Sequence, residues 1–193
     1  VSGANRVTDD GTSVYTYDAE GNRTGKTDKT TGAATQYTWD HRNRLVGTST
    51  RDASGALTAS ETLGYDDFGW KVARTVDPDG DGPQALRTET FIHDRDDGAG
   101  TLAQIFMHAP GGDNVLAEQS GNTLRWSLAD HEQTVRDVVD ASGNLLNHLR
   151  YDSFGAITAQ TDTALAPRFS YTGRELDTTA GLMDYRARWY DPA

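Results

Sequence analysis

The sequence contains no cysteine, few apolar residues and a shortage of positive charge. Without cysteine, neither a disulfide framework nor a cysteine-ligated metal site can form. Hydrophobic residues make up only 35% of the 193 residues, and no run of 18 apolar residues occurs, so we expect no membrane insertion. The 18 Lys and Arg residues are outnumbered by 29 Asp and Glu residues, giving a net charge of -11. This balance argues against a nucleic-acid partner.

Turn-forming residues are abundant instead. The chain has 20 glycines, and their combination with Thr, Asp and Tyr is typical of short strands joined by many turns. The chain begins at Val1 and shows no signal peptide, so we expect a processed piece of a larger protein.

A short unit recurs along the chain: an apolar residue, any residue, an aromatic residue, Asp, two further residues, then Gly or Asn. The spacing is 22 residues from Tyr17 to Trp39 and 26 residues from Trp39 to Tyr65. A period in the twenties indicates an internal repeat of stacked units. The copies contain Tyr17, Asp18 and Gly21; Trp39, Asp40 and Asn43; Tyr65, Asp66 and Gly69; Phe91, His93 and Asp94 in a degraded form; and Tyr151, Asp152 and Gly155.

Each copy predicts the end of a strand followed by a turn. The Asp side chain can bond its own backbone, and Gly21 supplies a backbone conformation that other residues resist. A second turn sequence, Asp-Ala-Ser-Gly, occurs at residues 52–55 and 140–143 and indicates a second type of turn. Alternating turns between short strands predict an antiparallel meander, so the predicted fold class is all-β.

The stretch from Tyr171 to Pro192, YTGRELDTTAGLMDYRARWYDP, interleaves arginines with aromatic residues and predicts two packed strands. It resembles the start of the Rhs-associated core, the C-terminal end of the Rhs and YD-repeat proteins, which include bacterial polymorphic toxins, insecticidal toxin complexes and teneurins. The motif positions are Tyr171, Gly173, Arg174, Glu175, Asp177, Gly181, Tyr185, Arg186, Arg188, Tyr190, Asp191 and Pro192.

The repeats extend this resemblance along the chain, and residues 140–155 are similar to the last repeat of the family. We therefore expect YD-repeat strands in residues 1–123 and the start of the Rhs-associated core in residues 124–193, as one continuous structural unit. The resemblance implies a curled or spiralling sheet that forms part of a shell.

A structural function follows from the resemblance: a shell segment that encapsulates or scaffolds a polypeptide cargo, such as a C-terminal toxin, in a secreted or cell-surface bacterial protein. The resemblance implies no enzymatic activity, because the aspartates associated with self-cleavage in toxin members lie beyond the position of Ala193. The expected partners are the cargo, an adjoining Rhs chain, and further copies of this chain, since the strands at the ends of a sheet expose unpaired backbone groups.

An extracellular adhesion or carbohydrate-binding module on the same repeats is the alternative. It would use exposed tryptophans to stack on sugars, although packing between strands also explains these residues. The tryptophans are Trp39, Trp70, Trp126 and Trp189.

Asp77, Asp79 and Asp81 stand at alternate positions, as in the first half of a calcium loop. The position of the bidentate Glu of an EF-hand is Thr88, so an EF-hand is excluded. An irregular calcium loop and a plain acidic turn both remain open. The sequence contains no phosphate loop and no serine nucleophile motif, so no other cofactor and no catalytic residue are predicted.

Overall fold

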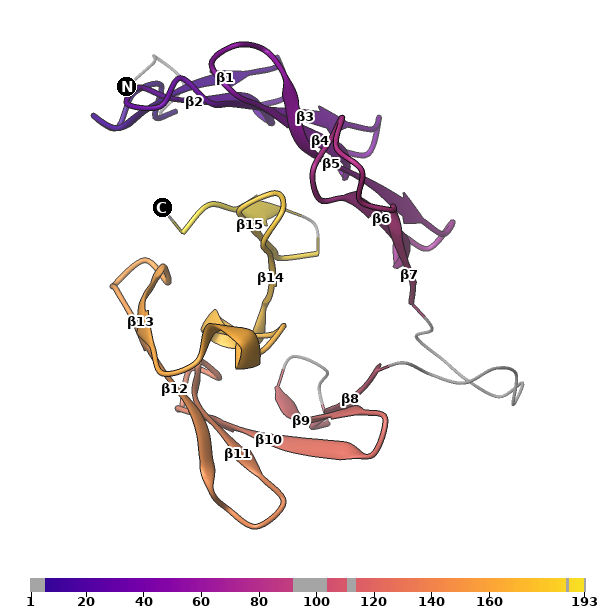
Figure 1. Ribbon diagram of the computed structural model, residues 1–193, viewed down its shortest axis with the longest axis vertical. Helices are drawn as coiled ribbons and strands as arrows, with labels where there is room; N and C mark the ends of the chain where they lie inside the picture. The colour runs from indigo at the N-terminus through magenta and orange to yellow at the C-terminus, as the bar shows by residue number, and fades with distance from the viewer. Residues whose placement is uncertain (1–5, 92–103, 111–113, 187, 193) are drawn as a thin grey trace. The chain divides into compact units, whose positions relative to one another are not determined.

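The computed structural model describes residues 6–91, 104–110, 114–186 and 188–192 (Figure 1). The chain forms two units, residues 1–96 and 97–193. Strands dominate both units, and two short 3-10 helices are the other regular elements in the described part of the chain. The predicted all-β class and the antiparallel meander are confirmed. The predicted segments 1–123 and 124–193 stay a prediction, and residue 123 lies inside the second unit.

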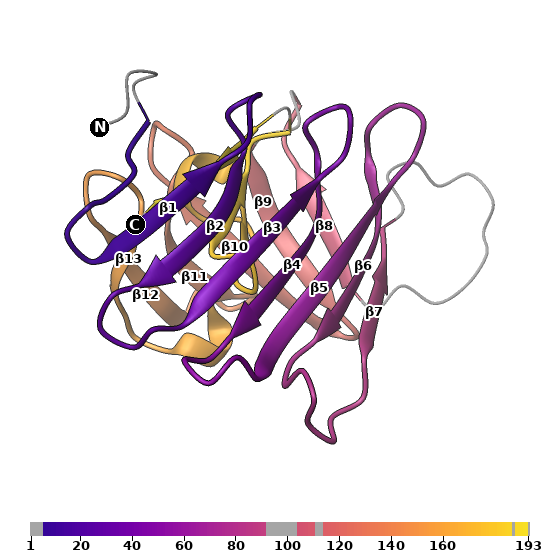
Figure 2. The same cartoon turned by 90° about the horizontal axis from the view of Figure 1, so that it is seen from above.

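The first unit is an antiparallel sheet whose strands are hydrogen-bonded in chain order. Figure 2 shows these strands side by side. The strands are β1 (Ser13–Tyr17), β2 (Arg23–Asp28), β3 (Ala34–Trp39), β4 (Leu45–Arg51), β5 (Leu57–Tyr65), β6 (Lys71–Asp77) and β7 (Arg87–Thr90).

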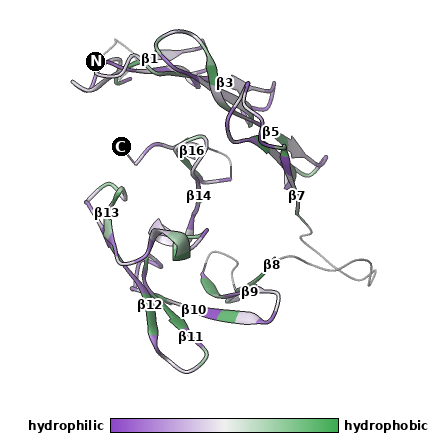
Figure 3. Cartoon of the chain, viewed as in Figure 1, coloured by the Kyte–Doolittle hydropathy of each residue, from purple (hydrophilic) through white to green (hydrophobic). Residues whose placement is uncertain are grey.

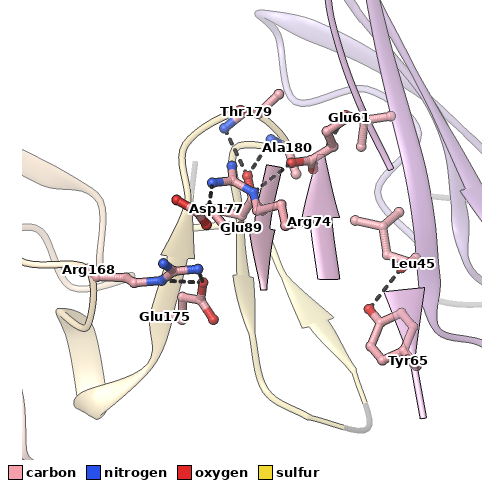
Figure 4. Close-up of polar contacts among 11 residues, drawn as sticks. Leu45, Glu61, Tyr65, Arg74, Glu89, Arg168, Glu175, Asp177, Thr179 and Ala180 are labelled. Atoms are coloured by element: carbon pink, nitrogen blue, oxygen red, sulfur yellow. Dashed lines mark hydrogen bonds and ion pairs between the residues drawn. The ribbon is translucent and has the colours of Figure 1, made fainter. Parts of the chain in front are cut away.

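One face of this sheet carries the buried side chains because side chains alternate along a strand. Tyr15, Tyr37 and Leu63 are buried, and so are the polar residues Thr48 and Glu61. The Glu61 carboxylate accepts a hydrogen bond from Nε of Arg74 at 3.1 Å, so this buried charge is paired (Figure 4).

The second unit contains a sheet in the order β13-β12-β11-β10-β9-β8 and a small sheet in the order β14-β15-β16. The first sheet comprises β8 (Gln104–His108), β9 (Val115–Ser120), β10 (Thr123–Ala129), β11 (Val135–Asp140), β12 (Leu145–Tyr151) and β13 (Ile157–Gln160). The helices η1 (Thr163–Leu165) and η2 (Tyr171–Gly173) and the strands β14 (Glu175–Asp177), β15 (Leu182–Asp184) and β16 (Trp189–Tyr190) follow.

The core of the second unit lies on β11 and β12, where Figure 3 shows hydrophobic residues. Val135, Val138 and Leu149 are buried and in contact, and Tyr151 and Ile157 pack against them. The other buried apolar residues of this unit are Val115, Ala117, Ala180, Leu182 and Met183.

A register shift directly precedes each described repeat aromatic that ends a strand. The shifts lie before Tyr17, Trp39, Tyr65 and Tyr151. Such bulges bend a strand and increase its twist. In the described residues, no helix is long and apolar enough to cross a membrane.

Candidate functional site in the repeat turns and the C-terminal segment

Within the described residues, seven turns share one hydrogen-bond scheme. In each turn the Asp N–H donates to the carbonyl of the fourth residue after it, and that residue's N–H donates to the Asp carboxylate. The N–H of the third residue donates to the Asp carbonyl, and this third residue has positive φ. The turns begin at Asp18, Asp40, Asp52, Asp66, Asp130, Asp140 and Asp152.

This scheme confirms the predicted role of glycine, with φ of 97° at Gly21 and 95° at Gly155. It also corrects one expectation. The Asp-Ala-Ser-Gly turns at residues 52–55 and 140–143 are the same turn as the aromatic-Asp turns, because the Asp and a third residue with positive φ make the same hydrogen bonds in both.

Hydrogen bonds to the carboxylate lower the pKa in five of these turns, at Asp18, Asp40, Asp52, Asp130 and Asp140. The side-chain amide of Asn144, together with backbone N–H groups, holds the pKa of the Asp140 carboxyl below its usual range. At Asp40, burial opposes ionisation, but the backbone N–H and guanidinium of Arg44 outweigh it and lower the pKa. These carboxylates are therefore ionised at neutral pH and fix the turns.

Three repeat aromatics link their repeat to an earlier part of the sheet. The polar hydrogen of each donates to the backbone carbonyl of the fifth residue after an earlier turn Asp, which is Asp18, Asp40 or Asp130. The bonds join Trp39 Nε1 to the carbonyl of Arg23 (2.7 Å), the Tyr65 hydroxyl to Leu45 (2.8 Å, Figure 4) and the Tyr151 hydroxyl to Val135 (2.9 Å). An aromatic with a polar tip is therefore favoured at this position.

The fourth residue after the turn Asp makes a second link. Arg44 donates from Nε to the Asp40 carboxylate at 2.8 Å and from Nη1 to the Asp66 carbonyl at 3.3 Å. Its guanidinium also lies over the Tyr65 ring, with Cζ 4.6 Å from the centroid. One arginine therefore ties the turns at Asp40 and Asp66 together.

Asn22 occupies the same position one repeat earlier. Its Nδ2 donates to the Asp18 carboxylate at 2.9 Å and to Oδ1 of Asn43 at 2.8 Å. The sequence prediction missed these connecting residues. The available signal was the polar residue directly after Gly21 and Asn43.

In the second unit the C-terminal segment joins this arrangement. The Val135 N–H donates to the carbonyl of Ser170 at 3.0 Å, and the Thr172 N–H donates to Oγ1 of Thr134 at 3.0 Å. Thr134 is the fourth residue after Asp130 and is fully buried. Residues 170–172 therefore lie against the turn that begins at Asp130.

The same segment covers the turn that begins at Asp152. The Tyr171 ring lies so close to Gly155 that a Cβ there would be 2.4 Å from Cδ1 of the ring. The hydroxyls of Tyr171 and Tyr190 donate to the carbonyls of Ser153 (3.4 Å) and Phe154 (2.7 Å). The predicted motif residues Tyr171 and Tyr190 are thus brought to the predicted turn residues Asp152 and Gly155.

Within the segment, the backbone turns sharply at Thr172, with φ of 49°, and at the buried Gly173, with φ of 68°. The hydroxyls of Thr172 and Tyr185 are hydrogen-bonded at 2.6 Å. Tyr185 also packs edge-on against Tyr190, with centroids 5.7 Å apart, and Arg174 lies over its ring.

Asp177 ends β14 with a longer turn than the repeat turns (Figure 4). Its Oδ1 accepts from the N–H groups of Thr179 (2.9 Å) and Ala180 (3.1 Å), and Gly181 follows with φ of 66°. Nε of Arg168 donates to the Glu175 carboxylate at 2.7 Å.

The remaining motif residues line the end of the segment. The N–H of Arg186 donates to the Asp184 carboxylate at 2.7 Å. Arg186 and Arg188 are exposed, and Asp191 and Pro192 are half-buried.

The acidic loop after β6 uses its carboxylates locally. Oδ1 of Asp77 accepts from the Gly80 N–H at 2.9 Å, and Oδ2 of Asp79 accepts from the Gln84 N–H at 2.9 Å. In the described part of the chain, no three His, Asp or Glu side chains are grouped to hold a metal ion. Calcium binding by Asp77, Asp79 and Asp81 stays a prediction. His93 and Asp94 lie outside the described residues.

Comparisons with known proteins agree with this architecture. Residues 111–193 match the family model described as teneurin YD-shell. A chain of the Photorhabdus luminescens Tc holotoxin pore superposes over 93% of this chain and 11% of its own length, with a TM-score of 0.60 and 16% identity. A chain of the TcdB2-TccC3 crystal structure superposes over 94% of this chain and 9% of its own length, with a TM-score of 0.54 and 16% identity. The resemblance to the Rhs/YD-repeat family is confirmed. The match to this family model supports a structural shell role for the chain.

Two curated relatives match nearly the whole chain. The tRNA3(Ser)-specific nuclease WapA of Bacillus spizizenii is 25% identical over 97% of this chain, and the tRNA nuclease WapA of Bacillus subtilis is 24% identical over 97%. The chain spans 8% of the length of each relative.

These names correct the expectation of no enzymatic activity, because both relatives are named as nucleases. The physical reason for the error is that the repeats encode turns and strand links. Such a pattern carries no information about the chemistry of the rest of a long protein. The expectation of no nucleic-acid partner came from the charge of this chain alone and stays a prediction for it.

Proposed function

We propose that this chain is part of the wall of a YD-repeat shell that encloses a polypeptide cargo. The observation that carries the proposal is the repeated link: Trp39, Tyr65 and Tyr151 each bond the backbone at the fifth residue after an earlier turn Asp. A sheet that grows by identical steps can be extended over a long chain, as a wall requires.

The activity of the whole protein is part of the proposal. The two relatives are named tRNA nucleases, so we infer that the enclosed cargo is a nuclease that acts on tRNA. A part that binds tRNA is expected to be basic. The net charge of -11 on the wall segment complements such a cargo.

Release of the cargo onto a target cell implies a secreted or cell-surface protein, which is the localisation that we propose. A carbohydrate-binding module is the second candidate function. Trp70 and Trp126 are 50% and 37% exposed, which leaves ring faces that can stack on sugars.

Limited proteolysis of the whole gene product that contains this chain tests the wall. The proposal expects polypeptide adjoining this chain to resist protease while the repeats are intact. Replacing Tyr65 and Tyr151 by Phe removes two repeat links and should make the adjoining polypeptide sensitive, whereas Trp126→Phe, outside the links, should not. Equal digestion in all three proteins would contradict an enclosing wall. Retention on a glycan array that is lost in Trp126→Ala would favour the second candidate.

A further inference from the structure

The pair of turns at Asp40 and Asp66 in the first unit and the pair at Asp130 and Asp152 in the second are connected differently. Between the turns at Asp40 and Asp66, the long side chain of Arg44 makes the connection. Between the turns at Asp130 and Asp152, the equivalent position holds Thr134, whose short side chain cannot span from one turn to the next. Its hydroxyl instead accepts a hydrogen bond from the backbone of another segment.

That segment, residues 170–173 with the sequence Ser-Tyr-Thr-Gly, is held at four points. The Ser170 carbonyl accepts a hydrogen bond from the Val135 N–H, and the Thr172 N–H donates to the Thr134 hydroxyl. These two bonds fix the position of the segment along β11. The Tyr171 ring lies on Gly155, and the Tyr171 hydroxyl donates to the carbonyl of Ser153. The rings of Tyr151 and Tyr171 are also in contact, with centroids 5.9 Å apart.

We propose that the space between these two turns is a peptide-recognition site, with Thr134 as the residue that determines its specificity. Its ligand is a segment with an aromatic residue followed by a residue in the left-handed conformation and a glycine. In this chain the ligand is residues 170–173, where Thr172 has φ of 49° and Gly173 has φ of 68°.

The chemistry of the site matches this ligand. The turn at Asp152 needs glycine at its third position for two reasons: φ is 95°, and the Tyr171 ring occupies the place of a side chain. The turn at Asp130 needs a short residue with a hydroxyl at its fourth position. A longer side chain would fill the place of the segment, as Arg44 does between the earlier turns.

This chain therefore contains two kinds of turn pair. A long polar residue at the fourth position joins neighbouring turns to each other. A short hydroxyl residue there leaves room for a chain segment to insert. The fourth position therefore determines where a distant part of the polypeptide is fastened to the sheet.

Amide hydrogen exchange of the full chain at Thr172 tests the proposal. Thr134→Val keeps the shape but removes the hydroxyl, so exchange at Thr172 should become roughly 2- to 10-fold faster. Thr134→Ser keeps the hydroxyl and should leave exchange near the wild-type rate. Asn22→Ala, at the same turn position in the first unit, should also leave it unchanged.

Thr134→Arg gives the stronger result. The arginine should displace the segment, so that exchange rises at residues 170–173 together while the amides of β11 and β12 keep their protection. Two results would overturn the proposal: equal exchange at Thr172 in the Val and Ser variants, or an Arg variant that retains the segment. If the Arg variant fails to fold, the Val and Ser pair decides alone.

Discussion

Gly155 offers the sharpest test of the turn geometry, because Gly143 provides a matched control. Both residues occupy the third position of the same turn, with φ of 95° and 84°. An added Cβ at Gly143 meets nothing within 4 Å, whereas one at Gly155 would lie 2.4 Å from Cδ1 and 2.6 Å from Cγ of Tyr171. The two substitutions to Ala therefore share a backbone cost and differ in a steric one.

The magnitudes can be estimated separately. A left-handed backbone costs an L-residue about 1 to 2 kcal/mol, so Gly143→Ala should lower the free energy of unfolding by about that much. Gly155→Ala adds overpacking against a ring, which typically costs about 1 to 3 kcal/mol. Cδ1 and Cγ belong to the rigid ring of Tyr171, so the clash cannot be relieved by moving the end of a flexible side chain.

Urea denaturation of both variants, followed by a probe in the second unit, measures this difference. Gly155→Ala should be less stable than Gly143→Ala by about 1 to 3 kcal/mol. In a Tyr171→Ala background the excess should disappear, since the ring is gone, and the double-mutant cycle then gives the coupling energy. Equal destabilisation by the two glycine substitutions, or an excess that survives Tyr171→Ala, would refute the placement of Tyr171 on the turn.

Further predictions concern the links, the carboxylates, the acidic loop and the sheet edge. Tyr65→Phe removes one link between repeats and should lower the free energy of unfolding by about 0.5 to 1.5 kcal/mol; an unchanged denaturation midpoint would count against the link. The pKa of Asp140 is depressed in the folded chain, chiefly by the Asn144 amide. Its contribution is therefore present above the unfolded pKa and is lost as pH falls through the folded value, so acid titration should show stability falling below about pH 4, less steeply in Asp140→Asn. If the acidic loop binds calcium, millimolar calcium should raise the melting temperature, and Asp79→Ala should abolish the rise; no shift in the wild type would leave an ordinary acidic turn. Strand β13 ends its sheet, so light scattering should show mass increasing with concentration through edge pairing; a strictly monomeric chain would contradict this.

The local structure could be predicted from the sequence because its determinants are local. An Asp that bonds its own turn and a Gly that supplies positive φ act within five residues. Asp18 and Gly21 therefore predict a turn without any information from the rest of the chain. The same holds for the alternation that places Tyr15 and Tyr17 on one face of their strand. The all-β meander follows from these short-range preferences repeated along the chain.

The links between turns were decided by the tertiary structure. Arg44 reaches the turn at Asp66, and Tyr151 reaches Val135, only because the strands are folded side by side. No local preference marks Thr134 as the acceptor for a backbone N–H that lies 38 residues further along the chain. A contact of that sequence separation depends on the path of the whole chain, so the sequence showed that the C-terminal segment packs, and the fold alone determined where.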